Sequence, residues 1–366
     1  MFFRNFTLYV SVKKRIELDH TCRSYKFTYC VLAFRKKVSI LLKLMNFSTH
    51  PSDLDKFSGD YNKIKQFLKK HAMHGLELIQ YSPWNDGVIP SSMIHGLHMR
   101  FWPMWLDFWR NDKSKLIKQF GEKSTWVHYY GGESRDAIIE HYQKELKDAC
   151  AMGAKYVVFH VCHVQLEHSY TYSFDYTDSE IIEAFIEMIN EVLEGFEPSF
   201  DLLLENLWWP GLTMLDKKNS TRLMERIKYP NKGFMMDIGH LMNTNKELKR
   251  EEEATDYILE VLDSLEDLAV NIKGIHLNSS LSGEYVKREI ASYKGHDYKG
   301  DFFNRYVKAF SHISQIDRHT PFTHPSIKKV IDYVRPQYLV YEFISESLNE
   351  LDKYIKEQDR ALESII

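Results

Sequence analysis

The stretch Phe234–Asn243, FMMDIGHLMN, places a buried-type apolar run directly before two side chains that can carry chemistry. Asp237 ends the run, and His240 follows three positions later. Two interpretations fit this pattern. Asp237 can cap an ordinary turn, or Asp237 and His240 can be metal ligands at the C-terminal end of a β-strand. The other apolar runs of the chain discriminate between these interpretations.

Seven further apolar runs alternate with segments of helical periodicity, such as residues 178–196, for which Thr177 or Asp178 is the predicted N-cap. A doubly wound sheet is disfavoured, because the segment after the first run lacks a GxGxxG phosphate loop. Eight β/α units predict an α/β fold, a closed (β/α)8 TIM barrel, with insertions after strands three and seven (102–132 and 279–323). The eight runs are ILLKLMNFS (40–48), LELIQ (76–80), GLHMRF (96–101), YVVFH (156–160), DLLLEN (201–206), GFMMDIG (233–239), IKGIHLN (272–278) and YLVYEFI (338–344).

Composition excludes several classes of protein. The chain has 44% hydrophobic and 27% charged residues, which is typical of a soluble globular protein. Its apolar runs are all shorter than the roughly 18–20 residues needed to cross a bilayer, so no membrane partner is expected. Four cysteines without CxxC spacing predict neither a disulfide framework nor a zinc knuckle, and they favour a cytoplasmic location.

Charge separates the start of the chain from the rest. Residues 1–44 contain ten Lys and Arg residues and two acidic residues. The remaining chain contains 38 Lys and Arg residues and 49 acidic residues. We interpret residues 1–44 as a basic N-terminal extension. It is either a targeting segment or an addition to a protein whose translation starts at Met45. Residues 45–366 form the predicted barrel. Its acidic balance disfavours nucleic acid as a partner without excluding it.

Six consecutive strands, the third to the eighth, end in an acidic residue or a histidine. In a parallel barrel these ends meet at one mouth, where barrel enzymes hold their chemistry. Three carboxylates that converge there would repel one another and raise their pKa values, and a divalent cation removes this penalty. Mixed carboxylate and imidazole ligands suit Mn, Co, Mg or Zn. The sequence therefore predicts a divalent metal site among His98, His160, Glu205, Asp237, His240, His276 and Glu342.

The motifs ENLWWPG (205–211), MMDIGHLMN (235–243), GIHLN (274–278) and YEF (341–343) resemble the xylose isomerase-like TIM barrel superfamily. The resemblance covers most of residues 45–350. The superfamily includes sugar isomerases and epimerases, and also abasic-site nucleases of the endonuclease IV type. In the isomerase branch, the resemblance implies proton transfer at a metal-bound enediolate by the glutamates of strands five and eight, Glu205 and Glu342. It implies that the metal ligands are Glu205, Asp237, His276 and Glu342.

The nuclease branch holds a three-metal cluster, and each of its additional ligands has a counterpart in this chain. The chain departs from the nuclease pattern in two places. About 40 residues separate the strand-seven histidine from Asp-Arg-His (317–319), and TPFTHPSIKK (320–329) replaces the usual glycine-rich stretch. The resemblance implies that the additional metal or substrate ligands are His98, His160, His240, Asp317 and His319.

Our leading hypothesis is a divalent-metal-dependent isomerase or epimerase acting on a sugar or a related hydroxy-carbonyl compound. The alternatives are a metal-dependent phosphodiesterase of the endonuclease IV type and a non-catalytic barrel that binds a metal or a sugar. One metal per chain favours the isomerase, and two or three favour the hydrolase. Trp208, Trp209 and Arg318 are the predicted substrate contacts. A homo-oligomer is left open.

Overall fold

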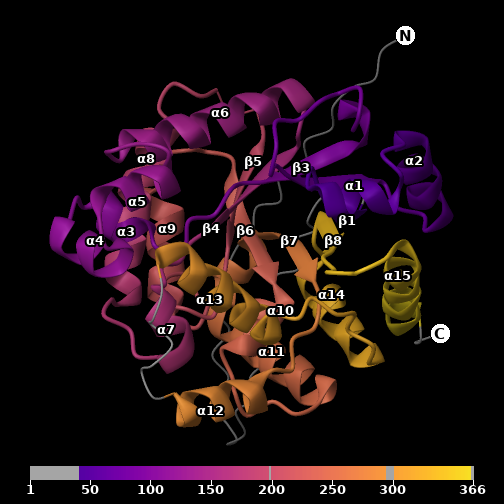
Figure 1. Cartoon of the computed structure of the whole chain (residues 1–366). Helices are drawn as coiled ribbons and strands as arrows, with labels where there is room; N and C mark the ends of the chain where they lie inside the picture. Colours follow the sequence, from indigo (N-terminus) through magenta and orange to yellow (C-terminus); the bar gives the residue numbers. More distant parts are fainter. Residues whose placement is uncertain (1–40, 198, 294–300, 364–366) are drawn as a thin grey trace, which may run out of the picture. The chain divides into compact units, whose positions relative to one another are not determined.

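The computed structural model describes residues 41–197, 199–293 and 301–363. Within these residues, eight parallel strands pair in chain order and close through β8 and β1, with helices around them (Figure 1). The predicted (β/α)8 TIM barrel is confirmed, and residues 1–40 of the predicted extension lie outside the described residues. The strands are β1 (Leu42–Ser48), β2 (Gly75–Ile79), β3 (Ile94–His98), β4 (Tyr156–His160), β5 (Asp201–Glu205), β6 (Lys232–Asp237), β7 (Ile272–Leu277) and β8 (Tyr338–Tyr341).

Helices cover the outside of the barrel, and local sequence explains where they start. Thr177 caps α8, because its Oγ accepts the Glu180 N–H while the Glu180 carboxylate accepts the Thr177 N–H. The α-helices are α1 (Pro51–Lys56), α2 (Tyr61–Lys70), α3 (Trp105–Trp109), α4 (Lys113–Phe120), α5 (Lys123–Tyr130), α6 (Asp136–Met152), α7 (Leu166–Thr171), α8 (Asp178–Val192), α9 (Lys217–Arg226), α10 (Ile238–Asn243), α11 (Glu251–Leu265), α12 (Gly283–Ser292), α13 (Phe302–Ile316), α14 (Lys328–Val334) and α15 (Leu348–Glu363). Short 3₁₀ helices are η1 (Ser91–Met93), η2 (Glu266–Asn271) and η3 (Pro325–Ile327).

Alternation along the strands decides which side chains reach the barrel interior. Outward residues such as Leu204 and Met236 belong to the large core between the strands and the helices. A separate cluster fills the interior, and it contains Leu44, Tyr156, Val158, Leu203, Met235, Tyr338 and Val340. Two positions further along the chain, the acidic residues Glu205 and Asp237 end β5 and β6, and Glu342 directly follows β8.

The connections after β3 and β7 contain several helices each. The first connection holds α3 to α6, and the second holds α12, α13 and α14. In the first, the indole N–H of Trp105 donates to the carbonyl of Cys162 at 2.8 Å, and Trp109 is also buried. These two tryptophans therefore pack α3 onto the barrel. Among the described residues, no helix is both long enough and apolar enough to cross a membrane.

Candidate metal centre

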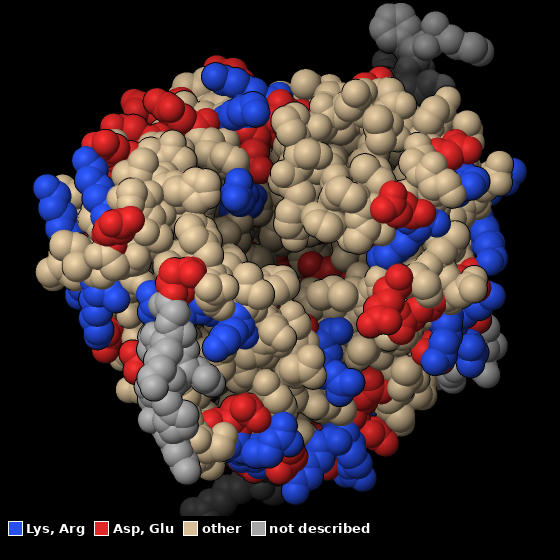
Figure 2. Space-filling model, viewed as in Figure 1, with Lys and Arg blue, Asp and Glu red and all other residues tan. Residues whose placement is uncertain are grey.

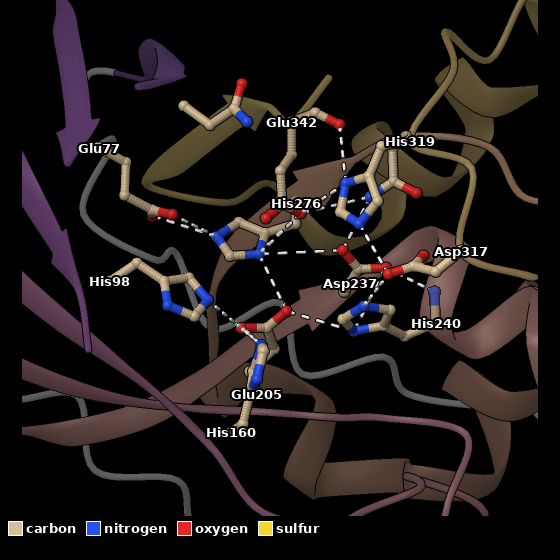
Figure 3. Close-up of polar contacts among 12 residues, drawn as sticks. Glu77, His98, His160, Glu205, Asp237, His240, His276, Asp317, His319 and Glu342 are labelled. Atoms are coloured by element: carbon tan, nitrogen blue, oxygen red, sulfur yellow. Dashed lines mark hydrogen bonds and ion pairs between the residues drawn. The ribbon is translucent and has the colours of Figure 1, made fainter. Parts of the chain in front are cut away.

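All nine predicted ligands lie together at the C-terminal mouth of the barrel (Figure 3). Their ligand atoms form overlapping groups, and within each group these atoms lie within 4.8 Å of one another. His98 also forms a group with His276 and Glu342, so the ligand atoms of neighbouring groups lie close together. We name the first group His98, His160 and Glu205, the second group Glu205, Asp237, His276 and Glu342, and the third group His240, Asp317 and His319.

Glu205 belongs to both the first and the second group, and its two oxygens face different partners. Oε2 lies 3.1 Å from His98 Nε2 and 3.0 Å from His160 Nε2. Oε1 lies 3.1 Å from His276 Nδ1. The side chain is fully buried at the end of β5. A carboxylate held in this way could serve as a ligand in both groups.

Asp237 has two roles, because it ends β6 and also caps α10. Its Oδ1 accepts the backbone N–H of His240 at 2.5 Å, and its Oδ2 accepts Asn278 Nδ2–H at 2.8 Å. A Cβ on Gly239 would lie 1.9 Å from Asn278 Oδ1, so only glycine lets this amide approach. Oδ2 also lies 3.9 Å from His276 Nδ1. The capped turn and the candidate ligand therefore coexist in one side chain.

The third group lies beside the second, and Asp317 joins its two histidines. Asp317 Oδ2 is 3.2 Å from His240 Nε2 and 2.8 Å from His319 Nε2. Asp317 and His319 follow α13, so the long connection after β7 delivers them to the mouth. The His240 imidazole is directed at this group.

In four candidate histidines, the ring nitrogen that points away from the cluster contacts a hydrogen-bond acceptor. We call it the outer nitrogen, and this arrangement is expected around a bound metal. His98 Nδ1 contacts the carbonyl of Met99 at 3.0 Å. His240 Nδ1 contacts the carbonyl of Asn206 at 2.9 Å, and His319 Nδ1 contacts that of Glu342 at 3.2 Å. For His276, Nε2 lies 3.1 Å from Glu77 Oε2. Each acceptor fixes the ring and leaves the other nitrogen facing a carboxylate of the cluster, so the donor set fits divalent cations.

Glu77 is a functional candidate that the sequence analysis missed. It lies in the middle of β2 and is fully buried, and it accepts the Tyr156 hydroxyl at 2.8 Å in addition to its contact with His276. Gly96 makes room for this arrangement, because a Cβ there would lie 2.2 Å from the Tyr156 ring. The available signal was a glutamate between two leucines in a run that is buried on both faces.

Comparison with known proteins assigns the family. A family model described as xylose isomerase-like TIM barrel matches residues 43–335. The chain belongs to the xylose isomerase-like TIM barrel family. Comparison with curated protein sequences finds no match.

Solved structures similar to this family member include both nucleases and epimerases. Endonuclease IV from Thermus thermophilus is 13% identical with a TM-score of 0.48, and the match covers 88% of this chain and 99% of that one. The 3-keto-D-glucoside 4-epimerase from E. coli is 12% identical with a TM-score of 0.45, covering 87% and 98%. D-Psicose 3-epimerase from Clostridium cellulolyticum is 11% identical with a TM-score of 0.45, covering 88% and 97%. Likenesses at this level do not decide between the two activities.

Charge in this family member's site is balanced between acids and histidines. Burial opposes ionisation of Glu205, but His160 and His276 hold its pKa well below the usual value. Burial opposes protonation of His276, but the pKa is raised well above its usual value by Glu342, Glu77 and Glu205. A proton on His276 therefore offsets part of the negative charge of the acids, whereas burial lowers the pKa of His160. A cation held by His276 would displace that proton, so its affinity should rise with pH.

Burial raises the pKa of Glu342 to about 8. Asp237 and Glu205 add to this increase, while His276 and His319 oppose it. Glu342 therefore carries a proton near neutral pH in the metal-free site.

The predicted substrate contacts lie at different depths. Trp208 and Trp209 are buried, and the Trp208 ring centroid lies 5.2 Å from that of His240. Both indoles belong to an apolar cluster with Cys162, Val164, Leu207, Val286 and Ile316. Arg318 is exposed, and its backbone N–H donates to Ser280 Oγ at 3.0 Å. Their contact with substrate stays a prediction.

Proposed function

We propose that this chain is a metal-dependent phosphodiester hydrolase that binds up to three divalent cations. The observation that carries the proposal is the third group. A one-metal isomerase needs only the second group, and His240, Asp317 and His319 would then have no shared purpose. Instead, Asp317 Oδ2 lies within 3.2 Å of both histidines, and backbone carbonyls hold the outer nitrogens of the two rings.

The roles of the residues follow from this geometry. Bound cations supply Lewis acidity, which stabilises negative charge on a phosphate during an in-line displacement. Glu205 couples the first and second groups through its two oxygens and fixes their separation. Glu342 would be a ligand in the second group, and its Oε2 lies 3.7 Å from His319 Nδ1, where the second and third groups adjoin. Arg318 stays a candidate for contact with a phosphate oxygen.

Metal analysis combined with a hydrolysis assay tests the proposal. Elemental analysis of the purified, metal-loaded protein should give two or three divalent cations per chain. The same protein should hydrolyse bis(p-nitrophenyl) phosphate, and a chelator should abolish the reaction. His324→Ala, a histidine outside the three groups, serves as the control for His319→Ala. Three bound cations without hydrolysis of any phosphodiester would contradict the proposal.

The isomerase or epimerase remains a second candidate, and a specific observation favours it. The second group by itself provides a four-residue site for one cation, and Glu205 and Glu342 both face His276 Nδ1, at 3.1 and 3.2 Å. Two carboxylates on one site suit proton transfer next to a carbonyl, one as acid and one as base. One cation per chain, together with solvent deuterium exchange into a ketose, would establish this activity instead of hydrolysis.

A further inference from the structure

We infer that the substrate is a small phosphodiester and not a DNA duplex, because helices from opposite strands meet and close part of the barrel mouth. This inference rests on the proposed hydrolase function and specifies its substrate class. It follows from contacts between the connection after β3 and the connection after β7. In an eight-stranded barrel, the third and seventh strands lie on opposite sides.

Helices α4 and α5, which follow β3, contact α13, which follows β7. The Phe120 and Phe302 ring centroids are 4.4 Å apart, and both side chains are buried. The Tyr129 and Tyr306 ring centroids are 5.7 Å apart. Arg305 Nη2–H donates to the carbonyl of Gln119 at 2.6 Å. Aromatic packing and a charged hydrogen bond thus hold the two connections together.

The connection after β7 also contacts the segments that follow β4 and β5. His312 on α13 contacts the carbonyl of Ser169 at 3.0 Å and stacks on Tyr170, and both partners belong to α7 (Figure 1). Val286 of α12 and Ile316 of α13 share the apolar cluster of Trp208 and Trp209. We call α12 and α13, with their contacts to α4, α5 and α7, the helical bridge. Its contacts extend from the β3 connection to the β5 connection.

The remaining opening is narrow and offers little to a polyanion. Figure 2 shows a hollow where Figure 1 places β6 to β8, with acidic atoms at its floor and mostly uncharged residues at its rim. On the described surface of this face, Lys and Arg are interspersed with Asp and Glu and form no continuous stripe. A duplex needs basic groups along a long open surface. A small phosphodiester needs only to enter the hollow.

A substrate series on the metal-loaded, full-length protein tests the inference. The probes are bis(p-nitrophenyl) phosphate, thymidine 5′-(p-nitrophenyl phosphate) and a labelled duplex with one abasic site. We expect kcat/KM for the nucleotide ester to exceed that for duplex cleavage by about 100-fold or more. We also expect fluorescence anisotropy to give a duplex Kd weaker than about 10 µM at physiological salt.

The outcomes separate this inference from the proposed function. Duplex cleavage that matches or exceeds ester hydrolysis would overturn the inference and leave the hydrolase function intact. Hydrolysis of neither class by the fully loaded protein would overturn the hydrolase function, and the inference with it.

A matched pair of variants on α13 tests the role of the bridge. Tyr306→Ala removes a ring that contacts Tyr129, whereas Phe310→Ala removes a ring that is 61% exposed on the same helix. We expect Tyr306→Ala to raise the ratio of duplex to ester kcat/KM by about 5-fold or more, and Phe310→Ala to leave it unchanged. Equal ratios in both variants and the parent would show that the bridge does not limit substrate size. The series on the parent protein decides the inference even if Tyr306→Ala fails to fold.

Discussion

Glu77→Gln should weaken metal binding at the second group while preserving the volume of the side chain. In the parent protein, the carboxylate accepts two donors, the Tyr156 hydroxyl at 2.8 Å and His276 Nε2–H at 3.1 Å. Both donors reach the same oxygen, Oε2, and the other oxygen, Oε1, lies 3.0 Å from His276 Nε2. Glutamine replaces one of the two oxygens by an NH2 group, so an amide donor then faces the His276 N–H or the amide turns away. The His276 ring then loses the contact that directs Nδ1 toward Glu205 and Glu342.

The size of the effect follows from burial. Loss of a partner of this kind typically lowers metal affinity about 10- to 100-fold. Glu77 and His276 are both fully buried, so water cannot replace the lost acceptor, and we expect the upper end of that range. A 100-fold weaker Kd removes about 2.7 kcal/mol of metal-dependent stabilisation at saturating metal. Glu77 also raises the pKa of His276, so this pKa should be lower in Glu77→Gln. Protons then compete less with the metal for His276, and the difference in metal affinity between the variant and the parent should be smaller at low pH.

Calorimetric titration of metal-free protein and thermal unfolding with and without metal measure this effect. Asp201→Asn is the control, because Asp201 starts the same strand that Glu205 ends and contacts Lys273 away from the site. We expect Asp201→Asn to keep the parent affinity for the metal. Equal metal affinities in Glu77→Gln, Asp201→Asn and the parent would refute the reasoning.

Substitutions at three further positions probe separate parts of the fold. His319→Ala should lower the metal content by one cation per chain, and an unchanged content in elemental analysis would contradict a third site. Burial lowers the pKa of His163 well below 6.5, so the unfolded chain takes up a proton that the folded chain excludes. The contribution of His163 to the free energy of unfolding should therefore be largest above pH 6.5 and be lost as the pH falls below it. The difference in unfolding free energy between the parent and His163→Gln, measured by urea titration, should shift in favour of the variant as the pH falls through 6.5. Asp237→Asn should keep the cap of α10 and lose metal affinity, whereas Asp237→Ala should cost roughly 1 kcal/mol more in metal-free stability. Equal stability of these two variants would show that the cap contributes nothing.

Most of the fold could be predicted because buried parallel strands are short, nearly continuous apolar runs. The ends of the strands were predicted less accurately. The predicted sixth strand extends to residue 239, whereas β6 ends at Asp237 and α10 begins at Ile238. The Asp237 carboxylate accepts the His240 N–H and so starts the helix two residues early. An apolar pattern alone cannot show this change, because Ile238 and Gly239 fit either a strand or a buried helical turn.

Seven of the nine candidate ligands could be located because each lies at or just after the end of an apolar strand, at the same edge of the barrel. Asp317 and His319 follow α13 instead, and only the resemblance to the superfamily pointed to them. Glu77 could not be found in this way, because it lies two residues before the end of β2 and below the mouth. The helical bridge could not be predicted from the sequence either. The periodicity of α13 indicates that one face is buried, but it does not identify Phe120, which lies in another connection, as the partner of Phe302.

Asp237 and His240 show why two interpretations of one motif need not exclude each other. A carboxylate has two oxygens, and a helix cap uses one of them. Oδ1 of Asp237 binds the His240 N–H, which leaves Oδ2 for Asn278 and the second group. The same turn directs the His240 ring toward Asp317, where Nε2 joins the third group. One Asp-x-x-His turn can thus supply adjacent metal positions, because the cap that starts the helix also fixes the separation of the two ligands.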